Sequence, residues 1–155
     1  MHNDFFYMGM TTMTLEGAIR NIDTFEEFEK KFTEDFLDDD KQVCYYLAEL
    51  VRKYDAVCTA VSEKAGYAPA YLGNIINGAK NNPSRNVLIS MCLALGTTVE
   101  EVQKLLKYAG HAPLYVRRKR DVIIWFGFMK GLSPDDVDEL LQDRGYAPIT
   151  RLAKK

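Results

Sequence analysis

Two short helical patterns separated by a glycine constrain the fold of this chain more than any other feature. The first pattern covers about residues 57 to 65, and Gly66 interrupts it. The second pattern starts near Pro69, a residue that suits the first turn of a helix, and Gly78 ends it. The apolar positions of the two patterns are Val57, Val61, Leu72, Ile75 and Ile76. Two short helices joined by a glycine-containing turn predict a helix-turn-helix.

Three further helical patterns flank this motif. Apolar residues recur at helical spacing over residues 41 to 54, 85 to 95 and 98 to 109. Thr98 with Glu101 predicts a capping box at the start of the last pattern. The sequence therefore predicts an all-α domain of five helices.

This five-helix pattern resembles the Xre-type helix-turn-helix regulators of the lambda-repressor and Cro superfamily. The resemblance rests on Ala65-Gly66, on Tyr71-Leu72-x-x-Ile75-x-x-Gly78, on Asn82-Pro83-Ser84 and on Leu88 through Gly96. It implies that the second helix of the motif enters the major groove of double-stranded DNA. The DNA-contacting residues that it implies on this helix and the following loop are Ala70, Tyr71, Asn74, Asn77, Lys80, Asn81 and Asn82.

The chemistry of these residues fits the implied role in part. Asparagine can bond adenine through paired contacts, and loop residues commonly meet phosphates. However, members of the family commonly have Gln at the start of the first motif helix and Arg or Gln on the second, where this chain has Cys58, and Gly73 or Asn74. The segment 55 to 83 has two bases and two acids, so its electrostatic attraction to DNA is weak. Additional phosphate contacts are expected from Arg117, Arg118, Lys119 and Arg120, for which a solvated linker is the alternative.

The chain repeats its last helical hairpin. An offset of 35 residues aligns Arg85-Asn-Val-Leu-Ile with Arg120-Asp-Val-Ile-Ile, and Gly110-His-Ala-Pro-Leu with Gly145-Tyr-Ala-Pro-Ile. The copies cover about residues 84 to 118 and 119 to 153, and we expect two similar hairpins that share one core. This layout, with an extra hairpin, is similar to a group of Xre-type regulators from clostridial bacteria.

The second copy contains the run Val122-Ile-Ile-Trp-Phe-Gly-Phe-Met, which is apolar on every side of a helix. A helix of this kind is buried on both faces. We therefore expect it to lie between the N-terminal leader and the rest of the chain, or in a homodimer contact.

An acidic leader precedes a basic body. Residues 1 to 40 hold 11 acids and 3 bases, a formal charge of −8, whereas residues 41 to 155 hold 11 acids and 17 bases, a charge of +6. Helices are predicted over about residues 13 to 22 and after Asp23, the second with an aromatic stripe of Phe25, Phe28, Phe32 and Phe36. The stripe should be buried, either by folding back across the body or by binding a protein partner. The predicted organisation is an acidic helical leader over residues 1–39, a helix-turn-helix domain over 40–111 and the duplicated hairpin over 112–155.

Composition and motif content exclude several other classes. At 155 residues and 47% apolar content, the chain can bury a substantial core. Cys44, Cys58 and Cys92 lack metal-ligand spacing and fall on apolar stripes, which predicts buried reduced thiols. No phosphate-binding loop, paired histidine and acid, or nucleophile elbow is present, so neither an enzyme nor a cofactor is predicted. No signal peptide or membrane-spanning run is found, so a cytoplasmic location is expected.

Two functional hypotheses follow. The first is a sequence-specific DNA-binding transcriptional regulator that uses the helix-turn-helix, with a homodimer as one expected form. The second is a protein-interaction adaptor that keeps the fold but binds little or no DNA, which the near-neutral motif and the acidic leader favour. A shift of random duplex DNA by the protein at low salt would separate them.

Overall fold

The protein is all-helical in the part that the structure describes. The computed structural model describes residues 12–31 and 39–150, and every regular element within these ranges is an α-helix. The chain divides into two compact units, Met1–Asp38 and Asp39–Lys155. The all-α prediction is therefore confirmed. Among the described helices, none is both long and apolar enough to cross a membrane.

The first unit contains α2 (Thr12–Asn21) and α3 (Phe25–Lys31). The Oγ1 atom of Thr24 accepts a hydrogen bond from the backbone N–H of Glu27 at 3.2 Å, so Thr24 caps the start of α3. Phe28 is buried, whereas Phe25 is 66% exposed. The other two residues of the predicted aromatic stripe, Phe32 and Phe36, lie outside the described residues.

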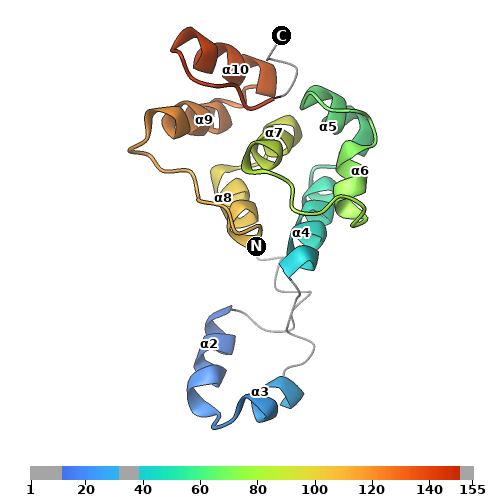
Figure 1. Cartoon of the computed structure of the whole chain (residues 1–155), viewed down its shortest axis with the longest axis vertical. Helices are drawn as coiled ribbons and strands as arrows, with labels where there is room; N and C mark the ends of the chain where they lie inside the picture. Colours follow the sequence, from blue (N-terminus) through green and yellow to red (C-terminus); the bar gives the residue numbers. More distant parts are fainter. Residues whose placement is uncertain (1–11, 32–38, 151–155) are drawn as a thin grey trace. The chain divides into compact units, whose positions relative to one another are not determined.

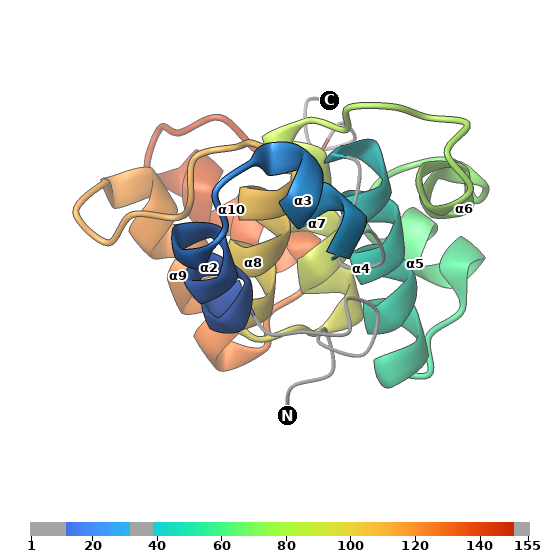
Figure 2. The ribbon, with the colours of Figure 1, turned by 90° about the horizontal axis from the view of Figure 1, so that it is seen from below.

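The second unit is built around one buried helix, α7 (Arg85–Leu95). Its other helices are α4 (Asp39–Lys53), α5 (Cys58–Lys64), α6 (Tyr71–Ile76), α8 (Val99–Tyr108), α9 (Lys119–Lys130) and α10 (Pro134–Asp143). Helix α7 packs against α5, α8 and α10, and all of its residues from 87 to 95 are buried (Figure 1). Helix α4 lies between α8 and the α5–α6 pair (Figure 2). The motif helices thus pack on a buried core.

A buried carboxylate joins the end of α4 to the start of α8. Glu101 accepts hydrogen bonds from Lys53, from the hydroxyl of Tyr54 at 2.5 Å and from the N–H of Thr98 at 3.0 Å. The Thr98 hydroxyl in turn accepts from the N–H of Glu101, which completes the predicted capping box. Burial alone would raise the pKa of Glu101, but these hydrogen bonds outweigh it and hold the pKa below its ordinary value.

The hairpins α7–α8 and α9–α10 repeat the same local structure at the offset of 35 residues. Gly96 and Gly131 both end the first helix of a hairpin in the left-handed conformation, with φ of 83° and 66°. Such φ values favour glycine because other side chains are strained there. Ser133 repeats the capping box of Thr98, with Asp136 in the place of Glu101.

The segment after each hairpin is fastened in the same way. The Gln103 side chain accepts a hydrogen bond from the N–H of Leu114 at 2.7 Å, and its counterpart Asp138 accepts from the N–H of Ile149 at 2.6 Å. Asp138 is 2% exposed and also accepts two bonds from Thr150. The duplication seen in the sequence therefore extends to individual hydrogen bonds.

The two hairpins exchange contacts reciprocally through two equivalent arginines. Arg85 donates to the Asp121 carboxylate at 3.1 Å, and Arg120 donates to the Asn86 side chain at 3.3 Å. The carbonyl acceptors within each arginine's own hairpin are Ala112 and Pro113 for Arg85, and Ala147 and Pro148 for Arg120. Since Asn86 and Asp121 are themselves equivalent positions, each arginine bonds the equivalent residue of the other hairpin.

One apolar expectation is wrong for the described residues. Val57 is 63% exposed, because it is the extended residue that precedes α5 rather than part of its buried face. The second unit by itself does not bury α9 on all sides, since Phe126 and Met129 are 48% and 68% exposed. The expected contact of this helix with the leader or with a second copy stays a prediction.

Candidate nucleic-acid interface

The turn between α5 and α6 is closed by backbone hydrogen bonds. Gly66 has a φ of 90°, and the N–H of Tyr67 bonds the carbonyl of Ser62 at 2.9 Å, which ends α5. The N–H of Tyr71 bonds the carbonyl of Ala68 at 3.0 Å. Pro69 therefore lies in the turn and α6 begins at Tyr71, two residues later than the position of the proline suggested.

Helix α6 takes its N-terminal cap from α5. Ala70, at the N-cap position, offers no side-chain hydrogen bond. Instead, the hydroxyl of Ser62, fully buried in α5, accepts from the N–H of Leu72 at 2.9 Å and donates to the carbonyl of Cys58 at 2.8 Å. One serine thus satisfies an amide that the start of a helix leaves unpaired and fixes the angle between the two helices.

The outward side of α6 carries the predicted DNA contacts. Leu72 and Ile75 are buried in the core, which fixes the rotation of the helix. Ala70 and Asn77 are exposed, and Tyr71 and Asn74 are partly exposed. The four predicted residues of this helix and its ends thus retain access to solvent and lie opposite a fixed buried face.

Tyr71 is held by two neighbours. Its ring stacks on the ring of Tyr67, with centroids 4.6 Å apart and an interplanar angle of 16°. The Nζ atom of Lys80 lies 4.9 Å from the centroid of the Tyr71 ring, a cation–π contact. The ammonium group of the loop is therefore placed beside the first residue of α6.

The loop that follows α6 is exposed and has a defined shape. Gly78 and Asn82 have left-handed φ values of 84° and 52°. The Asn77 side chain accepts from the N–H of Ala79 at 2.9 Å, and the N–H of Lys80 bonds the carbonyl of Asn74 at 2.9 Å. Asn77 thus uses part of its hydrogen-bonding capacity inside the loop, whereas Asn81 and Asn82 are exposed like Lys80.

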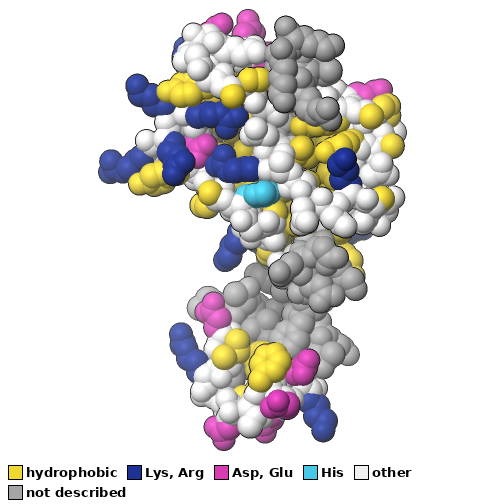
Figure 3. Space-filling model, in the orientation of Figure 1, with side chains coloured by type: hydrophobic (Ala, Val, Ile, Leu, Met, Phe, Trp, Pro, Cys, Tyr) yellow, Lys and Arg dark blue, Asp and Glu magenta, His cyan; other side chains and the backbone are white. Residues whose placement is uncertain are grey.

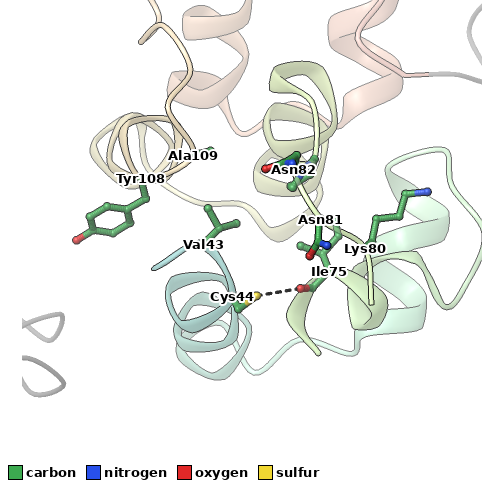
Figure 4. A pocket seen from close by; sticks show the side chains of 9 residues that line it. Val43, Cys44, Ile75, Lys80, Asn81, Asn82, Tyr108 and Ala109 are labelled. Carbon is green, nitrogen blue, oxygen red and sulfur yellow. Dashed lines mark hydrogen bonds between the residues drawn. The ribbon is translucent and has the colours of Figure 1, made fainter. Parts of the chain in front are cut away.

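A small cavity lies behind this loop. It has a volume of about 70 Å³, and its walls include Val43 and Cys44 of α4, Ile75 of α6, and Asn82. The thiol of Cys44 donates to the carbonyl of Ile75 at 3.2 Å, so α4 supports the end of α6 from within (Figure 4). The side chain of Lys80 points away from the cavity (Figure 4).

The structure separates the four basic residues of the 117–120 run. Arg117, Arg118 and Lys119 are exposed, and Lys and Arg side chains gather over this part of the surface (Figure 3). Arg120 is partly buried and donates to Asn86 and to two carbonyls of the second hairpin. Burial, and next the neighbouring Arg85, lower the pKa of Arg120. Its guanidinium holds the two hairpins together, while the other three cations face solvent.

Sequence reasoning missed two residues that shape the interface. Tyr67 supports Tyr71 by stacking on its ring, a contact that the sequence pattern did not predict. Ser62 caps α6, and nothing in its sequence neighbourhood indicates a bond to an amide ten residues away.

Residues 59–102 match the family model described as Helix-turn-helix. The match starts at the second residue of α5 and ends within α8, so it contains the α5–α6 motif except Cys58, and all of α7. Over these residues the chain is therefore similar to the helix-turn-helix domains of the Xre and lambda-repressor type, a class that binds DNA. Comparison with curated proteins and with solved structures found no significant match. The family match does not extend to the second hairpin.

Proposed function

We propose that this protein is a sequence-specific transcriptional regulator that places α6 in the major groove of DNA. The observation that carries the proposal is the outward side of α6, which presents Asn74 and Asn77 from a helix-turn-helix packed on a buried core. Asparagine pairs with adenine through two hydrogen bonds. Asn77, whose side-chain oxygen already accepts one bond, is expected to discriminate bases less strongly than Asn74.

The charge around the motif predicts modest affinity with a shallow salt dependence. Between residues 65 and 84 the only charged side chain is Lys80, so acids do not repel DNA there, but few phosphates are neutralised. Each additional phosphate contact adds about 0.9 to the slope of log affinity against log salt. Arg117, Arg118 and Lys119 supply three further cations in this proposal.

The test is selection of duplexes from a random library, followed by titration of the preferred duplex and a scrambled one by fluorescence anisotropy. Asn74→Ala should reduce the preference for the selected duplex by about 1–3 kcal/mol. Lys80→Ala should weaken both duplexes equally and lower the salt slope by about 1. Lys107→Ala, which removes an exposed lysine of α8, is the matched control for charge.

The proposal includes a homodimer, which would present two copies of α6 to half-sites about 10 base pairs apart. Selected duplexes should then be palindromic, and binding should be cooperative in protein concentration. A protein that selects no sequence and has no affinity for duplex at low salt would overturn the proposal and support an adaptor function. Unchanged preference in Asn74→Ala would remove α6 as the element that contacts bases.

A further inference from the structure

Helix α9 carries an exposed apolar stripe. Val122, Phe126 and Met129, spaced at i, i+4 and i+7, are 41%, 48% and 68% exposed. This spacing places them on one face of the helix. Such a face is typical of the surfaces that bind another helix.

In the first hairpin, the equivalent face of α7 is covered by other helices. The counterparts of the three residues in α7, at the offset of 35, are Val87, Met91 and Ala94, which are only 6%, 0% and 9% exposed. Helix α5 packs against α7, and Val87 lines a cavity with Tyr67 and Tyr71 of the motif. Helices preceding the first hairpin therefore cover α7, and no described helix of this unit covers the equivalent face of α9.

A groove lies next to this stripe, at the position in the second hairpin that is equivalent to the cavity behind the motif loop. It has a volume of about 480 Å³ and is lined by Val116, Arg117, Val122 and Arg144, among others. The counterparts of Val116, Arg117 and Arg144 are Asn81, Asn82 and Ala109, which line the cavity of about 70 Å³ behind the motif loop. In the first hairpin α4 closes this space with Val43 and Cys44 (Figure 4). The second hairpin leaves the corresponding space open.

The charges around the stripe select an acidic occupant. Arg117, Arg118, Lys119 and Lys130 are all exposed, and the only acid between residues 116 and 130 is Asp121, which is buried against Arg85. The Nζ atom of Lys130 lies 5.8 Å from the centroid of the Phe126 ring, so a cation borders the stripe directly. Pairing with the same face of a second copy would bring like charges together, which is unfavourable.

We propose that the α9 face, formed by Val122, Phe126, Met129 and the adjoining groove, binds an acidic amphipathic helix of a partner protein. Apolar side chains of that helix would cover the stripe, as α5 covers α7. Its carboxylates would face Arg117, Lys119 and Lys130. This site is separate from α6 and does not depend on DNA binding.

The test uses the full chain and a fluorescein-labelled synthetic peptide as long as the 12 residues of α9 or slightly longer. The peptide carries Leu or Phe at helical a and d positions and Glu elsewhere. We expect saturable binding that weakens with salt, and about a tenfold or greater loss of affinity in both Phe126→Glu and Phe126→Ala. Val57→Glu, at another exposed apolar residue, is the matched control and should bind as the parent does.

Two control peptides test whether binding depends on the helical pattern and on the acidic charge. A peptide of the same composition in scrambled order, or one with Lys in place of Glu, should bind at least about tenfold more weakly. No binding, or equal binding of the scrambled peptide, would overturn the proposal. Sedimentation of the parent as a dimer that Phe126→Glu dissociates would instead assign this face to a second copy of the chain.

Discussion

Replacing Ser62 with alanine tests whether α6 is held by a cap from another helix. The Ser62 hydroxyl is fully buried and is the acceptor for the N–H of Leu72 at 2.9 Å. Alanine would leave this N–H buried without an acceptor, which costs about 1–3 kcal/mol. Alanine favours the helix by about 0.5 kcal/mol relative to serine, which offsets part of the loss. The expected net loss in the free energy of unfolding is about 0.5–2.5 kcal/mol.

Ser90→Ala is the matched control for this prediction. Ser90 is also fully buried within a helix, and its hydroxyl donates to the carbonyls of Asn86 at 2.8 Å and Ile149 at 3.2 Å. Its replacement removes a donor but leaves no backbone N–H without an acceptor, and a carbonyl oxygen can accept from more than one donor. We expect Ser90→Ala to cost less than about 1 kcal/mol.

Urea unfolding, followed by the fluorescence of the single tryptophan, Trp125, measures both variants. The melting temperature of Ser62→Ala should fall by several degrees, since about 1 kcal/mol corresponds to about 2–8 °C for domains of 60–250 residues. If DNA binding uses α6, the affinity of Ser62→Ala for duplex should also fall, because the start of the helix is no longer fixed. Equal costs for the two serine variants would refute the argument that Ser62 caps α6.

Three further predictions concern Glu101, Gly127 and Gly73. The carboxylate of Glu101, whose pKa is lowered on folding, contributes stability above its unfolded pKa of about 4.3 and loses that contribution as pH falls through the folded value. Urea unfolding should therefore show Glu101→Gln less stable than the parent at neutral pH, with a difference that narrows at acid pH; a constant difference would contradict the role of the charge. Gly127→Ala should lower the free energy of unfolding by about 1–3 kcal/mol, because its Cβ would lie 2.4 Å from a methyl of the buried Val137. An unchanged melting temperature would show that the hairpin adjusts to the added methyl group without cost. Gly73→Ala, with nothing within 4 Å of the added Cβ in α6, should instead stabilise the protein by up to about 1 kcal/mol, and a loss would indicate that α6 is less regular than described.

The helices and the duplication could be predicted because they depend on local and periodic features. Gly66, Gly96 and Gly131 end helices in left-handed conformations, and the φ values of 90°, 83° and 66° confirm that glycine is favoured at each. The Thr98 box depends on residues three positions apart, so the sequence contains both partners. Apolar periodicity likewise located the buried side of α6 at Leu72 and Ile75.

The candidate site could be predicted only in outline. The resemblance and the spacing located α6 and the loop that contains Lys80, and the family match agrees with the motif. Contacts that support this site come from elsewhere in the chain, such as the hydrogen bond from the Cys44 thiol of α4 to the carbonyl of Ile75. These partners depend on how the chain crosses itself, which local spacing does not encode.

By itself the sequence determined which segments are helical, where they end and which residues are apolar. The tertiary structure decided which apolar faces find a partner: Met91 in α7 is buried, whereas its counterpart Phe126 in α9 is 48% exposed. It also decided that Arg120 ties two hairpins together while Arg117 faces solvent, although both belong to one basic run. The physical reason is that periodicity records the chemistry of a helix face, whereas burial and hydrogen bonding depend on what lies opposite that face.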